Sequence, residues 1–379
     1  MLRFLTAGES HGPCLTAIVE GLPAGLSVDL DAVNYDLRRR QGGYGRGGRM
    51  EIEQDRVKIL GGLLYGKTTG APVALRIENK DWANWRDRWA SGDLPELTVP
   101  RPGHADYAGM VKYGLEDARL IAERASARET AARVAIGALT KQLLSHFGVA
   151  VGSYVTEIGG VVAELPELPP EQLWSQAEAS PVRCPDEEAA TGMTERIDEA
   201  RRAGDSLGGV FVVTATGVPI GLGSHAHWDR RLDARLIWAV TSIPAIKGAE
   251  VGPAFENARK PGTDVHDEFA MADGAVTRTS NHAGGLEGGM TNGMPIVVRA
   301  AMKPIPTTVT PLRSVDLETG DPAETEYQRS DVCAVPAASV VAEAVVAWTL
   351  ADALLEKLGG DSLDEMKAHA KELWSRPSS

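Results

Sequence analysis

The sequence predicts an α+β fold with mainly antiparallel sheets, and two observations carry this prediction. Segments with strand-like patterns precede long helical patterns, and the regular strand–helix alternation of a parallel sheet is missing. No linker of low complexity divides the chain, although its 379 residues would allow two medium domains. We therefore expect a single domain over residues 1–379.

Short strands are expected in the first quarter of the chain and again from its middle onward. Residues 56–60 and 72–77 predict a hairpin that is closed by the glycine-rich stretch between them. The other candidate strands cover residues 17–22, 151–162, 209–215 and 295–302. Their order along the chain does not match repeated βαβ units, which again favours antiparallel pairing.

Four segments predict helices. Residues 115–147 are rich in Ala, Arg, Glu and Leu and predict one long helix. Residues 337–358 are apolar on nearly all sides, which predicts a core helix. A helix with one polar side is expected at residues 186–203, and a short terminal helix at residues 364–374.

Composition excludes several partners. The net charge of −13 argues against nucleic acid and anionic membranes, which bind basic surfaces. Cys14, Cys184 and Cys333 are far apart, so neither a disulfide framework nor a zinc site is expected, and a cytoplasmic protein fits best. We see no signal peptide at the N-terminus and no uninterrupted apolar stretch long enough to span a membrane.

Two glycine-rich stretches imitate nucleotide sites. Residues 61–68, GGLLYGKT, match the phosphate-loop pattern, but β-like residues follow where that loop needs a helix. A hairpin turn is therefore favoured, with a phosphate-loop kinase or NTPase as the alternative. Residues 43–48 fit GxGxxG but follow a charged helix end instead of a buried strand. These glycines would still let Arg46 and Arg49 approach an anion closely.

Histidines in loops are the first candidates for chemistry. His11 lies in the short polar segment GESHG, where a histidine can titrate and donate a proton. His104 follows a Pro-Gly turn that would expose it, and an incidental surface histidine is the alternative. His225 and His227 are expected on one side of a strand, but no third ligand is near, so no metal is expected.

Basic and hydroxyl side chains recur in further motifs. Within the long predicted helix, Ser126 and Thr130 share one face and Arg124 and Arg128 another, which would suit a cofactor phosphate; a solvated helix is the alternative. Two prolines hold the loop after Lys303 extended. We expect the cations to surround a polyanionic ligand, in an enzyme or in a non-catalytic anion-binding protein: Arg40, Arg46, Arg49, Arg101, Arg128, Lys303 and Arg329.

An ordered set of motifs over nearly the whole chain resembles the chorismate synthases. They are GESHG at 8–12, RPGHADY at 101–107, SARETAARVA at 126–135, SHAHWDR at 224–230 and RSDVCAVPAASVVAEAV at 329–345. The resemblance implies a β-α-β sandwich, with a helical core layered between antiparallel sheets, and a homotetramer. It also implies the shikimate-pathway reaction that leads to the aromatic amino acids: 1,4-anti elimination of phosphate from 5-enolpyruvylshikimate-3-phosphate to give chorismate. Reduced FMN would be required without net redox change.

The resemblance also implies residue roles. His11 would protonate the departing phosphate, His104 would stand by the flavin, and Asp331 would help flavin N5 take the ring proton, although Asp331 could instead cap the core helix. Substrate or NADP anions would bind Arg40, Arg46, Arg49 and Arg128. The FMN contacts would be Arg124, Ala125, Ser126, Pro244, Ala245, Gly288, Lys303, Pro304, Ile305, Pro306, Thr307 and Arg329.

Two positions depart from the family pattern. Ala125 stands where the family commonly has serine, and Pro244 where a polar residue is usual, so two side-chain hydrogen bonds to the flavin are in doubt. The chain has the family's ordinary length and no added reductase domain. This favours an external flavin reductase, with NADPH as an indirect reductant.

Overall fold

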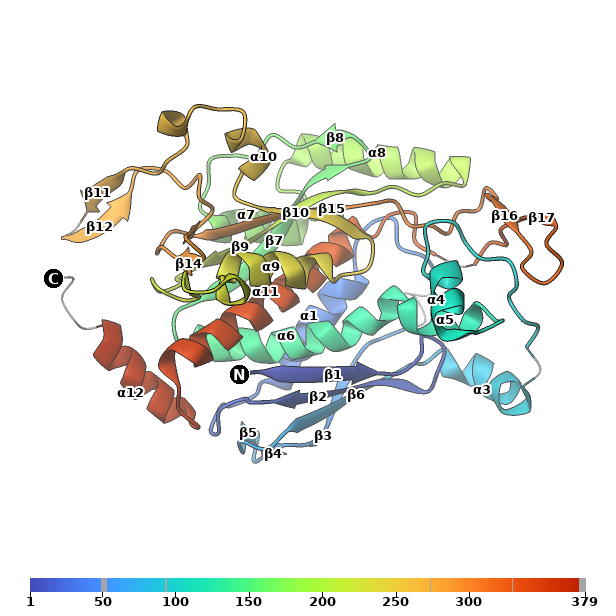
Figure 1. Cartoon of the computed structure of the whole chain (residues 1–379), viewed down its shortest axis with the longest axis horizontal. Helices are drawn as coiled ribbons and strands as arrows, with labels where there is room; N and C mark the ends of the chain where they lie inside the picture. Colours follow the sequence, from blue (N-terminus) through green and yellow to red (C-terminus); the bar gives the residue numbers. More distant parts are fainter. Residues whose placement is uncertain (49–52, 93, 273, 329, 375–379) are drawn as a thin grey trace.

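The computed structural model describes residues 1–48, 53–92, 94–272, 274–328 and 330–374. Arg49 and Arg329, both predicted to bind anions, lie outside the described residues. The described chain combines helices with antiparallel sheets, which confirms the predicted α+β class. The elements are arranged in layers (Figure 1).

The first sheet has four strands in the order β1 (Arg3–Ala7), β2 (Cys14–Glu20), β6 (Val73–Glu78) and β3 (Val57–Gly61). All neighbours are antiparallel. The predicted pairing of residues 56–60 with 72–77 is confirmed by β3 and β6, and the strand predicted at 17–22 begins earlier, as β2.

The second sheet has five strands, and its neighbours are also antiparallel. The order is β10 (Ile246–Val251), β15 (Ile296–Met302), β9 (Gly209–Thr216), β7 (Ala150–Ile158) and β8 (Val161–Val162). It contains the three segments that were predicted as strands in this half of the chain. Strand β10 at its edge was not predicted.

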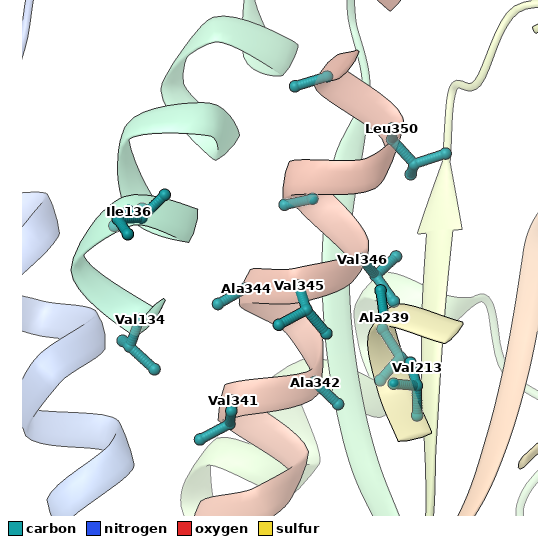
Figure 2. Packing of buried hydrophobic residues seen from close by; sticks show 14 of the residues in the cluster. Val134, Ile136, Val213, Ala239, Val341, Ala342, Ala344, Val345, Val346 and Leu350 are labelled. Atoms are coloured by element: carbon teal, nitrogen blue, oxygen red, sulfur yellow. The ribbon is translucent and has the colours of Figure 1, made fainter. Parts of the chain in front are cut away.

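Helices α1 (Leu30–Gln41), α6 (Thr130–Ser145) and α11 (Val335–Leu358) lie between the two sheets (Figure 1). Helix α11 packs on β7 and β9, and α6 packs on β2 and β6. Alanine and glycine let α6 and α11 approach closely: a Cβ on Gly137 would lie 2.3 Å from Cβ of Ala344. On the other side of α11, Val346 lies beside Val213 of β9 and Ala239 of α9 (Leu232–Thr241) (Figure 2).

Helix α11 confirms the predicted core helix. It is long and apolar enough to cross a membrane, but 89% of its apolar window is buried inside the protein. Because every side of this helix contacts other elements, its apolar composition reflects a central position in the core.

An ion network is also buried in the helical layer. Glu343 of α11 is fully buried and accepts hydrogen bonds from Arg39 at 2.7 and 2.8 Å and from Lys141 at 2.7 Å. Arg183 and Ser153 also donate to it, at 3.2 and 2.6 Å. Although burial opposes the shift, Lys141 and Arg39 hold the pKa of Glu343 well below its usual range.

The prediction of one helix over residues 115–147 is wrong. Helix α5 (Arg119–Ala125) ends before Ser126, a 3₁₀ turn follows (Ala127–Glu129), and α6 begins only then. Ser126 has an extended backbone, and its Oγ accepts a hydrogen bond from the Arg128 N–H at 3.2 Å. This cap offers the backbone an alternative to the helix. The helix faces expected for Arg124 with Arg128, and for Ser126 with Thr130, therefore do not exist.

The remaining helices surround this framework (Figure 1). The predictions at 186–203 and 364–374 are confirmed by α8 (Glu187–Ala203), capped by Asp186, and by α12 (Leu363–Trp374). The others are α3 (Trp82–Ser91), α4 (Asp106–Tyr113), α7 (Pro170–Ala179) and α10 (Ala254–Asn257). Small ribbons are formed by β4 (Leu63–Leu64) with β5 (Lys67–Thr68), β11 (Phe269–Ala272) with β12 (Ala275–Arg278), β13 (Leu286–Glu287) with β14 (Met290–Thr291), and β16 (Arg313–Val315) with β17 (Pro322–Glu324).

Both nucleotide-site motifs have the wrong surroundings. Residues 61–68 form the β4–β5 ribbon between β3 and β6, with no helix after it. Thr68 is buried, and its hydroxyl bonds the Leu26 N–H and the Pro23 carbonyl, so it is not available to a metal–phosphate group. Residues 43–48 follow α1, whereas a dinucleotide site follows a buried strand.

His225 and His227 were expected on a strand, and this expectation is also wrong. Both residues lie in a bend before a 3₁₀ turn (Trp228–Arg230), and His227 Nδ1 pairs with Asp229 at 2.7 Å. Within the described residues, no group of three or more His, Cys, Asp or Glu side chains is placed to hold a metal ion.

Candidate functional site

His11 lies in the loop between β1 and β2 and is held by α5. Its backbone N–H donates to Oε2 of Glu123 at 2.7 Å, and its Nδ1 lies 2.7 Å from Oε1 of the same residue. The Trp85 ring of α3 packs against the imidazole, with ring centroids 4.4 Å apart. Because a carboxylate only accepts, the Nδ1 of His11 carries a proton.

The backbone of this loop is fixed from several directions. Gly8 has φ +113°, and a Cβ there would lie 2.3 Å from the Cys14 carbonyl oxygen, so glycine is required. Asn79 donates to the carbonyls of Glu9 and Gly12, at 3.1 and 2.8 Å. The loop is therefore a preformed support for the histidine.

Two buried arginines share one carboxylate behind the histidine loop. Arg128 donates through Nη1 to both oxygens of Asp55, at 2.6 and 2.7 Å, and through Nε to Asn79 at 2.9 Å. Arg40 donates to Thr130 Oγ1 at 2.9 Å and to the Ala127 carbonyl at 2.8 Å. Its Nη1, 3.7 Å from Asp55, is buried and has no hydrogen-bond partner among the described residues.

The surroundings of Arg40 lower the pKa of its guanidinium. Burial lowers the pKa of Arg40 to about 9; Asp55 opposes this shift, and the neighbouring cations Arg128 and Arg46 add to it. The guanidinium is still charged at neutral pH. A buried cation with an unused N–H group is a strong donor for an anionic ligand.

Asp331 bridges two segments of the site. Its Oδ2 lies 2.8 Å from Arg46 Nη1, and its Oδ1 accepts the Gly47 N–H at 2.7 Å. Ala334 occupies the cap position of α11, and no side chain caps that helix. The alternative that Asp331 is a helix cap is therefore wrong.

His104 forms a second histidine–carboxylate pair. Its Nδ1 lies 2.5 Å from Oδ1 of Asp106, which also accepts hydrogen bonds from Arg101 at 2.8 and 3.0 Å. Although burial opposes the shift, hydrogen bonds from His104 and Arg101 hold the pKa of Asp106 well below its usual range. Lys303 Nζ donates to the Gly103 carbonyl at 2.5 Å, which places this ammonium beside the His104 loop.

Contacts connect these groups into one region. Ser126 joins Ser10 of the histidine loop, at 3.1 Å, to the Arg128 backbone. The charges of Arg46 and Asp331 act on Arg40, so these three lie near one another. Three further contacts extend the region: Ser330 Oγ donates to the Thr307 carbonyl at 2.8 Å, Arg101 Nη1 to Thr307 Oγ1 at 3.5 Å, and the Lys303 N–H to the Ala245 carbonyl at 3.0 Å. His11, His104, Asp331, Arg40, Arg46, Arg128 and Lys303 thus belong to one connected set.

Other predicted ligand residues flank this set. Arg124 extends to β1, where Nη2 donates to Thr6 Oγ1 at 2.6 Å, and Ala125 ends α5. Pro304, Ile305 and Pro306 form the segment between Lys303 and Thr307, and the Ile305 carbonyl accepts from Ser206 at 2.6 Å. Pro244 precedes Ala245, whose φ of +67° is in the left-handed region.

Gly288 and the segment of Pro244 and Ala245 lie near opposite ends of α9. Gly288 lies in the β13–β14 turn, next to Gly289, whose carbonyl accepts from Leu232 at the start of α9. Pro244 and Ala245 follow the other end of that helix. Ten helical residues span about 15 Å. Gly288 is therefore separated from Pro244 and Ala245 by about the length of this helix.

Four arginines of the site carry their own counter-ions. Arg46 pairs with Asp331, Arg101 with Asp106, and Arg40 and Arg128 with Asp55; Arg128 also approaches Glu53 at 3.7 Å. The protein itself therefore partly neutralises these four arginines, and the expected polyanionic ligand stays a prediction. Four carboxylates limit the repulsion among four arginines before any ligand binds.

Several residues of this region were not predicted from the sequence: Glu123, Trp85, Asn79, Asp55 and Glu53. Glu123 and Asp55 are 112 and 73 residues from the partners that they bind, His11 and Arg128. The one available signal was a carboxylate or amide close in sequence to a recognised motif. Glu123, just before Ser126, meets that criterion.

Comparisons with known proteins identify the family and the fold of the chain. A family model described as chorismate synthase matches residues 2–355. The chorismate synthase of Trichlorobacter lovleyi is 56% identical over 379 residues, covering 97% of each chain, and that of Listeria innocua is 53% identical over 380 residues, covering 98% of each. A crystal structure of a chorismate synthase superposes with a TM-score of 0.81 at 47% identity, covering 98% of this chain and 97% of that chain.

The fold and the site therefore define an enzyme, a carbon–oxygen lyase that acts on phosphate compounds. The chain belongs to the chorismate synthase family, and its reaction is the one that the family name states, the formation of chorismate in the shikimate pathway.

Proposed function

We propose that the chain performs this reaction as a 1,4-anti elimination of phosphate from 5-enolpyruvylshikimate-3-phosphate, with His11 as the proton donor to the departing phosphate. The observation that carries the proposal is the contact of His11 with Glu123 through Nδ1. Within the described part of the chain, Nδ1 is the ring nitrogen that makes a hydrogen bond, so Nε2 is left to serve the ligand. General acid help of this kind contributes about 10²–10⁴-fold to a rate.

The arginines would bind the anionic groups of the substrate. It carries two carboxylates and a phosphate, and Arg40, Arg46 and Arg128 lie behind His11 within one connected region. The unused Nη1 of Arg40 fits an anion, because it is buried and charged. Asp331 would help flavin N5 take the proton that leaves the ring carbon, and Arg46 holds its carboxylate at 2.8 Å. Arg49 is assigned the same anion-binding role.

The donors near Lys303 fit reduced FMN. Lys303, Thr307, Ser126 and Arg124 offer ammonium, hydroxyl and guanidinium donors to a phosphate and a ring carbonyl, with Arg329 added, and His104 would stand by the flavin ring. When bound, the flavin supplies electron density that assists loss of the leaving group and is then recovered. Ala125 and Pro244 would offer backbone contacts only, and Gly288 remains a proposed flavin contact.

The assembly and the reductant complete the proposal. The layers of sheet, helices and sheet would be the family's β-α-β sandwich, and four copies would form a homotetramer in the cytoplasm. FMN would be reduced by an external flavin reductase that uses NADPH; the family match accounts for residues 2–355 of the chain.

One assay tests the proposal. The purified protein is incubated without air with 5-enolpyruvylshikimate-3-phosphate, FMN and dithionite, and phosphate and chorismate are measured; equal yields are expected. Parallel samples receive ATP and Mg²⁺ alone, for the kinase alternative, or NADPH and FMN in air, where oxidation would reveal an intrinsic reductase. Binding without turnover would favour the non-catalytic alternative.

The role of His11 needs a matched pair of variants. His11→Ala should lower kcat by about 10²–10⁴-fold while FMN affinity stays close to that of the wild type. His146→Ala, which removes an exposed histidine at the end of α6, should leave both unchanged. Normal kcat in the His11 variant would remove this residue from the mechanism.

A further inference from the structure

We infer that Glu123 is a positioning residue for the reaction: it fixes the tautomer of His11 and lets the ring hold a second proton on Nε2. This inference rests on the proposed function, because it deepens the role of His11. Its structural part, the control of the tautomer, can be measured without any turnover.

Glu123 contacts the histidine loop through both its side chain and its backbone. Both side-chain oxygens of Glu123 are used on one residue, Oε2 on the His11 N–H and Oε1 on Nδ1, each at 2.7 Å. The Glu123 carbonyl also accepts the Ser10 N–H at 3.0 Å. Three hydrogen bonds thus tie the histidine loop to the last turn of α5. A surface ion pair formed by chance would not include the backbone of its partner.

Burial gives this contact its strength. The Glu123 side chain is 10% exposed and that of His11 25%, so water competes weakly for either group. Trp85 covers the face of the imidazole, which fixes the ring plane. The edge and the face of the ring are both contacted, so rotation about the Cβ–Cγ bond of His11 is restricted.

The break at Ser126 explains why Glu123 can reach the loop. Helix α5 stops at Ala125, and the chain turns before α6 enters the core. Ser126 contacts Ser10 at this turn, one residue from His11. The turn therefore brings two residues of the α5–α6 segment, Glu123 and Ser126, against the same loop.

The chemistry follows from what a carboxylate can accept. With Nδ1–H bound to Glu123, a proton on Nε2 makes the ring a cation that the carboxylate stabilises. After Nε2 gives its proton to the departing phosphate, the ring is neutral and still protonated on Nδ1, so it is ready to be recharged. No other group needs to move during this step.

Glu123→Gln has a defined effect on this arrangement. The amide oxygen of glutamine can accept the His11 N–H, but its NH₂ group then faces Nδ1 and requires an unprotonated Nδ1. The neutral ring should invert to the Nε2–H tautomer. A ring protonated on both nitrogens would place two donors face to face, so proton donation becomes difficult. We expect kcat to fall by about 10²-fold with the KM for substrate nearly unchanged.

The test combines spectroscopy with a double-mutant cycle. Solid-state ¹⁵N spectra of histidine-labelled protein, with His11 assigned by its loss in His11→Ala, should show Nδ1–H in the wild type and Nε2–H in Glu123→Gln. Glu123→Asp, which keeps a carboxylate, should retain the wild-type tautomer and part of the activity. Glu116→Gln, at an exposed position before α5, is the control and should match the wild type.

The cycle separates this inference from the proposed function. If Glu123 acts through His11, the double variant His11→Ala/Glu123→Gln should be as active as His11→Ala alone, within about twofold. A further tenfold loss, or an unchanged tautomer in Glu123→Gln, would overturn the inference. Full activity of His11→Ala would instead overturn the role of His11, while the ¹⁵N spectra would still decide what sets its tautomer.

Discussion

Arg46 and Asp331 form an ion pair of 2.8 Å across 285 positions of the sequence, between the segment after α1 and the segment before α11. The backbone fits around this pair, because a Cβ on Gly47 would lie 2.6 Å from the Ser330 carbonyl oxygen. The pair gives Asp331 a fixed place next to the buried arginines.

Asp331→Asn tests whether this carboxylate takes part in proton transfer. The amide oxygen can still accept the Gly47 N–H, so the loop should remain in place, but a neutral amide is a poor proton acceptor. We expect kcat to fall by about 10²–10⁴-fold, with substrate affinity retained. Steady-state kinetics with a direct binding measurement checks this, and a wild-type kcat would limit Asp331 to an architectural role.

Lys67 and Thr68 end the phosphate-loop motif. Their substitution should not have the effects that it would have in a kinase. Lys67→Ala removes an exposed side chain and should leave chorismate formation unchanged. Thr68→Val leaves the Pro23 carbonyl and the Leu26 N–H without a partner and should cost about 1–3 kcal/mol in the free energy of unfolding. Urea unfolding and the anaerobic assay measure both, and loss of activity on Lys67→Ala would revive the nucleotide-binding alternative.

The contact of α6 with α11 should be very sensitive to one methyl group. Gly137→Ala places a Cβ 2.3 Å from that of Ala344 and 2.4 Å from its Cα, so the two core helices must separate. We expect a loss of at least about 1–3 kcal/mol, the usual cost of overpacking. Gly61→Ala, at a position with open space, is the control in thermal unfolding; equal effects of the two changes would contradict the close approach.

Removing the centre of the buried ion network should destabilise the fold. Glu343→Ala leaves Arg39, Lys141 and Arg183 short of a counter-ion in the core, and breaking a buried pair in this way costs about 3–5 kcal/mol. Glu199→Ala breaks an exposed pair with Arg196 and should cost no more than about 1 kcal/mol. Chemical denaturation at pH 7 compares them, and similar losses would show that the network adds little.

The ion network around Glu343 also predicts how the free energy of unfolding changes at acidic pH. The pKa of Glu343 is lowered in the folded state, so its contribution to stability is complete above the ordinary value of 4.5 and is lost as the pH falls further toward the folded value. The free energy of unfolding of the wild type should therefore drop between pH 5 and pH 3. The drop should be smaller in Glu343→Gln, which does not titrate. Parallel pH curves for the two proteins would contradict this assignment.

The sequence predicts the elements whose local signals agree with their place in the fold. Asp186 before α8 and the apolar run of α11 are signals of this kind, and both helices appear where expected. The break at Ser126 was missed because alanine, arginine and glutamate on both sides favour helix, and one side-chain cap decides otherwise. Helix propensity depends on the local sequence and contains no information about the contact between Ser126 and the distant loop at Ser10.

The residues of the site also fall into two groups, those that local sequence patterns reveal and those that they do not. The motifs with histidine and arginine could be found from local patterns, since loops with glycine and isolated basic residues are visible in the sequence. Their partners are harder to find. Glu123 stands close to a recognised motif, but Asp55 looks like any surface carboxylate until the fold brings Arg128 to it. The distance between Gly288 and Ala245 likewise depends on the path of α9, which no local pattern indicates.

The built-in pairing of the arginines changes how a trianion would enter. Arg46, Arg101, Arg40 and Arg128 are already matched by carboxylates, and the net charge is −13, so these four arginines add little attractive field in the surrounding solution. Capture then resembles ion exchange, in which the incoming phosphate and carboxylates share or take over guanidinium groups from Asp55 and Asp331 at close range. The association rate should accordingly respond only weakly to ionic strength, unlike that of an enzyme with an open cationic funnel.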